Sequence, residues 1–295
     1  MADTTPDAEA SPLAKALSVV SAFGPPVAVA TALLVYFGWA RSDAQARAMG
    51  LDVSLFGYTV QDYVLRSIRS LFLPLVLLVI LAIGWLAADG WLTAHDAGGR
   101  RPLVRRTALA ATYAGIVAAG VGLLITIILP GRGVLFLPYV MAGGVLVAAW
   151  GVRLRRRSVP ARVTGPDAGA SPATRARFRA LEATLVFSLV TLLLFWGTAD
   201  FAQAVGRGLA AQIEQGVSTM PRASVYSGTR LGIGAPNVAE QLLPGGTAPL
   251  YKYRGLRLLV VSGGKFFFLH DGWTLRSGTV VVLPDNAAIR VELGN

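Results

Sequence analysis

The 295-residue sequence contains no cysteine, and charged residues make up only 15% of it. The lack of cysteine excludes disulfide bonds, thiolate metal sites and thiol nucleophiles. Soluble globular domains carry about 25% charged residues, whereas 54% of this chain is apolar. The composition therefore indicates that lipid, rather than water, surrounds much of the molecule.

Sequence motifs of catalytic and metal sites are also missing. The chain has no glycine-rich phosphate loop, no nucleophile elbow and no zincin spacing. Its two histidines, His95 and His270, each stand beside an aspartate without a second ligand at helical or hairpin spacing, so we interpret both as structural. We expect no enzyme activity, no cofactor and no metal.

Five apolar segments approach the length of about 20 residues that a bilayer-spanning helix needs. They comprise residues 19–40, 71–88, 107–129, 134–152 and 184–198. None of them contains Asp, Glu, Lys, Arg or His, which argues against transport coupled to protonatable groups. The predicted fold class is an α+β membrane protein: a five-helix transmembrane bundle within residues 19–202, followed by a small all-β domain outside the cytoplasm.

The distribution of basic residues predicts the topology. With residues 1–18 as a disordered cytoplasmic tail, the inner segments, which include loops 89–106 and 153–180, hold thirteen Lys and Arg residues, and the outer loops, including 41–70, hold five. Positive residues favour the cytoplasmic side, so the N-terminus is expected inside and the C-terminus outside, as in a bacterial cell membrane. The net charge of +11 therefore indicates lipid headgroups as partners and no nucleic acid.

A run of arginines follows the fourth segment, and it has two interpretations. The run could bind anionic lipid at about 1 kcal/mol per cation, or it could serve only as the inward anchor of that helix. Its members are Arg153, Arg155, Arg156 and Arg157.

The first outer loop contains candidate contact residues. Thr59 followed by Asp62 matches the spacing of a capping box, which predicts a helix start that leads into the second span. A partner or lipid contact is one interpretation, and an interfacial helix with one solvated ion pair, worth about 0.3–0.5 kcal/mol, is the other. The candidates are Gln61, Asp62, Tyr63, Arg66 and Arg69.

Beyond the last span, the pattern changes from helical to alternating. Residues 203–223 carry apolar side chains every four residues and are interpreted as an amphipathic stalk. Residues 224–295 alternate as strands do, and the Ser-Gly-Gly at 262–264 predicts a hairpin. Aromatic and basic side chains here form either a contact surface or a core with one solvated face. The contact candidates are Tyr253, Arg257, Lys265 and Trp273.

Small residues recur at helical spacing in the third and fourth segments, where they would let helix backbones approach closely. They define either a dimerisation or pore-lining face of a homo-oligomer, or ordinary packing inside one bundle. These residues are Ala111, Gly115, Ala119, Gly144 and Ala148.

Two stretches resemble a family of multi-pass membrane proteins of actinobacteria. They are YFGWAR at 36–41 continuing through GLD at 50–52 to QDYVLRS at 61–67, and YRGLRLL at 253–259 followed by SGGKFF at 262–267 and GW at 272–273. The resemblance implies an envelope protein with the same five-span plan, and it implies no activity. The function expected from the sequence is therefore to anchor an external β-domain that binds or senses an envelope component, with an oligomeric channel or pore lined by the third and fourth helices as the alternative.

The predicted topology can be tested by fusing a reporter that is active only in the cytoplasm to Asn295. We expect no reporter signal, because an odd number of spans places the two ends of the chain on opposite sides of the membrane. A strong signal at this position would overturn the orientation.

Overall fold

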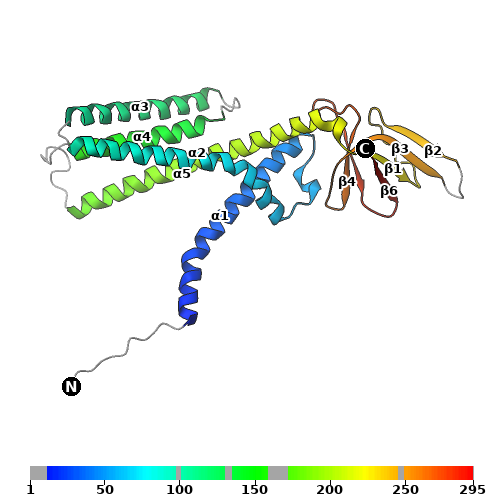
Figure 1. Cartoon of the computed structure of the whole chain (residues 1–295), viewed down its shortest axis with the longest axis horizontal. Coiled ribbons are helices and arrows are strands. Elements are labelled where there is room, and N and C mark those ends of the chain that lie inside the picture. Colours follow the sequence, from blue (N-terminus) through cyan, green and yellow to red (C-terminus); the bar gives the residue numbers. More distant parts are fainter. Residues whose placement is uncertain (1–11, 98–100, 130–134, 159–171, 245–248, 295) are drawn as a thin grey trace, which may run out of the picture. The chain divides into compact units, whose positions relative to one another are not determined.

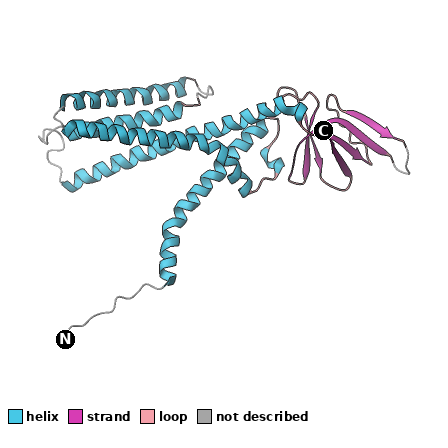
Figure 2. Cartoon of the chain, in the orientation of Figure 1, coloured by secondary structure: helices cyan, strands magenta, loops and turns pink. Residues whose placement is uncertain are grey.

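The computed structural model describes residues 12–97, 101–129, 135–158, 172–244 and 249–294. In this part of the chain five α-helices are followed by an antiparallel β-sheet (Figure 1, Figure 2). The helices are α1 Pro12–Ala48, α2 Val60–Ala97, α3 Arg101–Ile128, α4 Leu137–Ser158 and α5 Pro172–Gly216. Two short 3-10 helices, η1 Val53–Phe56 and η3 Val217–Thr219, precede α2 and follow α5.

Four of these helices are long and apolar enough to cross a membrane. Among the described residues the candidate spans are Val60–Trp91, Arg105–Ile128, Leu137–Arg156 and Ala176–Thr219. The chain therefore has the character of a membrane protein, as its composition predicts. The fifth expected span, 19–40, lies within α1 but is not among the four, and the side chains of residues 12–25 lie outside the described part.

The chain forms two compact units. One comprises Met1–Arg69 with Val205–Asn295 and is called the sheet unit below; the other comprises Ser70–Ala204 and is called the bundle unit. All but the first two residues of the segment predicted as a stalk, 203–223, therefore belong to the same unit as the sheet and residues 41–69.

In the bundle unit, α4 is in contact with each of the other helices. It packs along α3, it shares an apolar cluster with α5 through Met141 and Leu193, and its Trp150 donates a hydrogen bond to Asp89 of α2 at 2.8 Å. Large apolar side chains elsewhere on these helices are exposed, for example Leu86 and Phe187, at 71% and 72%. An exposed surface of this kind suits lipid contact, because lipid tails are as apolar as the side chains.

The sheet consists of six strands in antiparallel pairs. Their order is β5-β4-β3-β1-β6, and β2 pairs with β3 outside this path. The strands are β1 Arg222–Ser227, β2 Ala239–Leu243, β3 Leu250–Ser262, β4 Lys265–His270, β5 Val280–Pro284 and β6 Ile289–Gly294. Strand β1 begins two residues before the predicted boundary at 224.

Glycines with positive φ shape β3 at two points. Gly263 and Gly264, with φ of 56° and 68°, form the turn of the β3–β4 hairpin, as the sequence predicts. Gly255, with φ of 87°, lies where the β1–β3 register shifts, so that Tyr251–Arg254 and the following apolar run form one bent strand. A Cβ at Gly255 would lie 2.0 Å from the carbonyl oxygen of Asn237, which leaves no room for a side chain.

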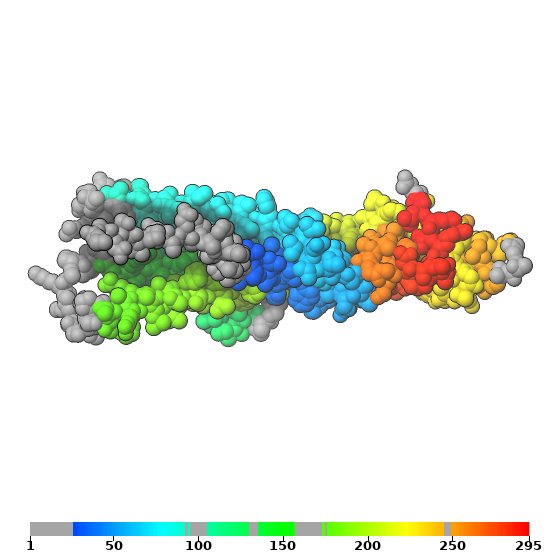
Figure 3. All heavy atoms as spheres, turned by 90° about the horizontal axis from the view of Figure 1, so that it is seen from below, coloured from blue at the N-terminus to red at the C-terminus, as the bar shows by residue number. Residues whose placement is uncertain are grey.

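Strand β4 is buried on both faces, which explains its continuous apolar sequence. Phe268 packs in a cluster with Val225 and Tyr253 on one face. On the other face, Leu269 packs with residues of α1 and α5, and Phe267 packs with the η1 segment. The sheet therefore packs against the helix ends of its own unit. Figure 3 shows this contact where the blue part of the chain adjoins the orange and red C-terminal strands.

The helix ends in the sheet unit approach one another at two glycines. A Cβ at Gly38 of α1 would lie 1.8 Å from the carbonyl oxygen of Tyr63 in α2, and one at Gly206 of α5 would lie 2.2 Å from the carbonyl oxygen of Arg41 in α1. Both neighbours are backbone atoms of helices, which cannot move aside as a flexible side chain can. The two glycines therefore set how closely α1 approaches α2 and α5.

Substitution of Gly206 by Ala should separate α1 from α5 and destabilise the sheet unit by about 1–3 kcal/mol or more, as overpacking does. The matched control is Gly208→Ala in the same helix, where a Cβ would meet nothing within 4 Å. This control should be neutral or stabilising by up to about 1 kcal/mol, because Ala has the higher helix propensity. Thermal unfolding followed by tryptophan fluorescence distinguishes the two, and equal midpoints would contradict the proposed crossing.

Candidate functional site

A hollow of about 350 Å³ lies within the sheet unit, between the helix ends. The charged residues of its lining are two arginines, Arg41 of α1 and Arg66 of α2. The other lining residues are Gln45 of α1, Leu209, Gln212, Ile213 and Gly216 of α5, and Thr219 and Met220, which follow α5. The hollow thus combines positive charge with an apolar wall.

The two arginines are held by contacts from different segments. Arg41 donates a hydrogen bond from Nη1 to the carbonyl oxygen of Arg66 at 2.8 Å. Burial lowers the pKa of the Arg41 guanidinium, and the positive charges of Arg66 and Arg69 lower it further. The Arg66 guanidinium lies over the ring of Tyr58, 3.8 Å from its centroid. The positive charges of these arginines therefore lie close together, which is electrostatically unfavourable.

The capping box predicted at the start of α2 is present. The Thr59 hydroxyl accepts from the backbone N–H of Asp62 at 3.3 Å, and the Asp62 carboxylate accepts from the backbone N–H of Thr59 at 2.8 Å. Because Asp62 also accepts from the Thr59 hydroxyl, its carboxylate is committed to the cap. Among the described residues no ion pair joins it to Arg66.

The other candidates of the outer loop fall in different environments. Gln61 and Arg69 are exposed, and Tyr63 is partly buried with its ring edge-on to Tyr58 at 5.9 Å. Of the five candidates, the structure places only Arg66 in the lining of the hollow. Its partner there, Arg41, was counted in the sequence only as one of the basic residues of the outer loops. No local pattern marks it, because it becomes part of a site only through the crossing of α1 with α2 and α5.

A series of ring contacts runs from the sheet to Arg66. Phe267 of β4 stacks on Phe56 at 4.6 Å between centroids, Phe56 stacks on Tyr58 at 5.2 Å, and Arg66 covers Tyr58. Ser262 at the hairpin also donates a hydrogen bond to the carbonyl oxygen of Phe56 at 2.6 Å. Burial raises the pKa of the Tyr58 phenol. The segment between α1 and α2 therefore packs against the sheet of its own chain.

Three of the contact candidates in the sheet are buried. Tyr253 is fully buried, Trp273 is 2% exposed and Arg257 is 8% exposed. The Tyr253 hydroxyl accepts from the backbone N–H of Leu231 at 2.7 Å. Only Lys265, at the start of β4, is partly exposed. The three buried side chains support the sheet from within, so a contact surface has to consist of other residues.

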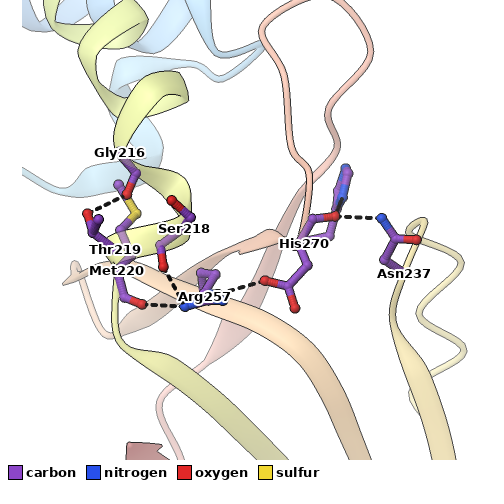
Figure 4. Close-up of polar contacts among 8 residues, drawn as sticks. Gly216, Ser218, Thr219, Met220, Asn237, Arg257 and His270 are labelled. Atoms are coloured by element: carbon purple, nitrogen blue, oxygen red, sulfur yellow. Dashed lines mark hydrogen bonds and ion pairs between the residues drawn. The ribbon is translucent and has the colours of Figure 1, made fainter. Parts of the chain in front are cut away.

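Arg257 joins the sheet to the end of α5 (Figure 4). Its Nε donates to the Asp271 carboxylate at 2.6 Å, and its Nη1 donates to the carbonyl oxygens of Ser218 and Met220 at 3.0 and 2.9 Å. Next to Asp271, His270 is buried, with Nδ1 3.0 Å from the carbonyl oxygen of Asp271. Among the described residues there is no group of three His, Cys, Asp or Glu side chains that could hold a metal ion.

The small residues of α3 and α4 face one another inside the bundle unit. A Cβ at Gly115 would lie 2.4 Å from the carbonyl oxygen of Gly144 and 2.5 Å from the backbone nitrogen of Ala148. A Cβ at Gly144 would lie 2.9 Å from the backbone nitrogen of Ala119. Ala111 is partly buried. These small faces form a close contact between two helices of one chain.

The arginine run after the fourth segment occupies the last turns of α4. Arg153 and Arg155 are exposed, and Arg156 forms an ion pair with Glu182 of α5 at 2.8 Å. The side chain of Arg157 lies outside the described part, as do those of His95 and Asp96. Three cations of the run therefore have exposed side chains, and one of them, Arg156, also has a protein partner.

Replacement of Arg257 by Gln should lower the unfolding midpoint by roughly 5–10 °C, because it removes charge-assisted hydrogen bonds worth about 1.5–3 kcal/mol each. The matched control is Arg254→Gln, which removes the same charge from an exposed position of the same strand. Thermal unfolding of the purified protein tests this, and a midpoint equal to that of the control would show that Arg257 does not secure the sheet to α5.

Comparisons of the chain with known protein families, with curated proteins and with solved structures give no match.

Proposed function

We propose that the chain is an integral membrane protein that holds a β-rich unit on the outer side of a cell membrane, where this unit binds or senses a component of the envelope. The proposal adds α1 as a fifth span to the four apolar helices of the described residues. The excess of basic residues in segments 1–18, 89–106 and 153–180 supports an orientation with the N-terminus inside and the sheet outside.

The observation that carries this proposal is the way the sheet is built into the helix ends of its unit. The stacked rings of Phe267, Phe56 and Tyr58 connect β4 to Arg66 near the start of α2. Arg257 connects β3 to the backbone that follows α5. A ligand that shifts the sheet would therefore disturb contacts at two helices that continue into apolar spans, which is what a sensor requires.

Basic side chains packed on an aromatic ring of the sheet provide a surface for such a ligand, with Arg290 exposed, Lys252 partly exposed and the Tyr226 ring buried beneath them. The guanidinium of Arg290 lies 4.4 Å from the centroid of the Tyr226 ring, and the ammonium of Lys252 lies 4.9 Å from it. The Tyr226 hydroxyl donates to Glu292 at 2.8 Å. Cations held against an aromatic ring suit a polar or anionic envelope component.

The alternative is an oligomeric channel or pore lined by α3 and α4. It has less support, because the closest small-residue contacts of these helices, Gly115 against Gly144 and Ala148, lie between the two helices of one chain. A pore would have to be lined by their remaining, mainly apolar faces. Such faces do not replace the hydration shell of an ion.

Photo-crosslinking in intact cells tests the proposal. A benzophenone amino acid at Arg254, which is exposed on β3, should form an adduct with an envelope component. The same amino acid at Leu185, 61% exposed on α5, should react only with lipid. Mass spectrometry of the purified chain distinguishes the adducts. If position 254 gave no adduct other than lipid, the proposed binding role of the sheet would fail.

A further inference from the structure

The hollow between the helix ends has an imbalance of charge in its lining. Two arginines, Arg41 and Arg66, line it together with two glutamines, and no acidic residue belongs to the lining. Arg69 is close enough to Arg41 to lower its pKa as well. Like charges are brought together only where other interactions compensate, and a bound anion is one such compensation.

Carboxylates near the hollow are already engaged elsewhere. Asp43 pairs with Arg47 at 3.0 Å, and Asp62 caps α2 through Thr59. Glu214 accepts a hydrogen bond from the backbone N–H of Leu275 at 3.1 Å. The chain's own acids in these helices therefore do not neutralise Arg41.

Arg41 also has an unused donor. Its Nη1 is held by the carbonyl oxygen of Arg66, whereas its Nε is buried and has no hydrogen-bond partner among the described residues. Because this Nε is closed to solvent, a ligand in the hollow would contact the other nitrogen atoms of the guanidinium. The guanidinium fork donates in pairs to the oxygens of a phosphate or carboxylate, and it is the side chain that most often binds phosphate in this way.

The rest of the lining restricts the type of anion. Leu209, Ile213 and Met220 give the hollow an apolar wall. Arg66 also stands within the candidate membrane span Val60–Trp91, six residues after its start. A volume of about 350 Å³ lies at the lower end of the range of about 300–1,000 Å³ that is usual for small-ligand sites. A phosphate group at the membrane surface fits these properties.

We infer that this hollow binds a phosphate group, through the guanidinium groups of Arg41 and Arg66 and the amides of Gln45 and Gln212. The phosphate is carried by the headgroup of a membrane lipid or is free in solution. In the first case the acyl chains continue along the apolar wall. The inference goes beyond the proposed function, because it concerns the helix ends and is independent of what the exposed sheet binds.

Binding can be measured with the full chain purified in a non-ionic detergent and stripped of lipid. Two probes are titrated separately, inorganic phosphate and a short-chain phosphatidylglycerol, and the unfolding midpoint is followed as each is added. A bound ligand raises the midpoint in a saturable manner. Saturation with phosphatidylglycerol alone identifies a lipid headgroup, and saturation with both probes at similar concentrations identifies free phosphate.

A matched pair of variants locates the site. Gln212→Glu places a carboxylate in the lining of the hollow, and Gln215→Glu places the same charge on an exposed position of the same helix outside the lining. Both substitutions are at exposed residues, so both variants should fold. Gln212→Glu should weaken binding at least about tenfold, because it sets a like charge against the phosphate, whereas Gln215→Glu should change it less than about threefold.

Arg41→Gln provides a second test at the residue with the unused donor, and it should weaken binding at least about tenfold by removing charge-assisted hydrogen bonds. Its control is Arg207→Gln, which removes the same charge from an exposed position of α5. The inference is overturned if neither probe raises the midpoint of the unaltered chain. It is also overturned if Gln212→Glu and Gln215→Glu bind the probes equally well.

Discussion

The sheet unit depends on the close approach of helix backbones at Gly38 and Gly206. These glycines let α1 lie directly against the start of α2 and the end of α5. Side chains at either position would force the helices apart, because the opposing atoms are carbonyl oxygens of neighbouring helices. The crossing of α1 with α2 and α5 creates both the surface against which the sheet packs and the hollow that Arg41 lines.

Two kinds of contact then secure the sheet to the helix ends. Apolar side chains pack around Phe267 and Trp273, and this burial is non-directional. The hydrogen bonds of Arg257 to Asp271 and to two backbone carbonyl oxygens are directional, and they fix β3 relative to the end of α5. Together they make the segment between α1 and α2, the end of α5 and the sheet one packed body.

This arrangement gives the arginines of the unit different roles. Arg257 is buried with a carboxylate and two carbonyl oxygens, so its charge is compensated within the chain. The charge of Arg41 is partly buried beside other cations and is not compensated by a carboxylate in the lining. The first is a structural residue and the second belongs to a site that is open to a ligand. Burial alone does not separate the two, whereas the identity of their neighbours does.

Local patterns in the sequence determined four of the apolar helices, the capping box at Thr59 and Asp62, and the glycine turn at 263–264, because each depends on residues that are close together in the chain. The burial of Tyr253, Arg257 and Trp273 was decided by the tertiary structure. An alternating sequence pattern shows that a strand has two faces, but it does not show that both faces are covered. The contact of the η1 segment with the β3–β4 hairpin joins residues about 200 apart in the chain, as between Phe56 and Ser262. The hollow likewise combines side chains from three helix ends, and only the packing of those helices brings Arg41 and Arg66 together with Gln212.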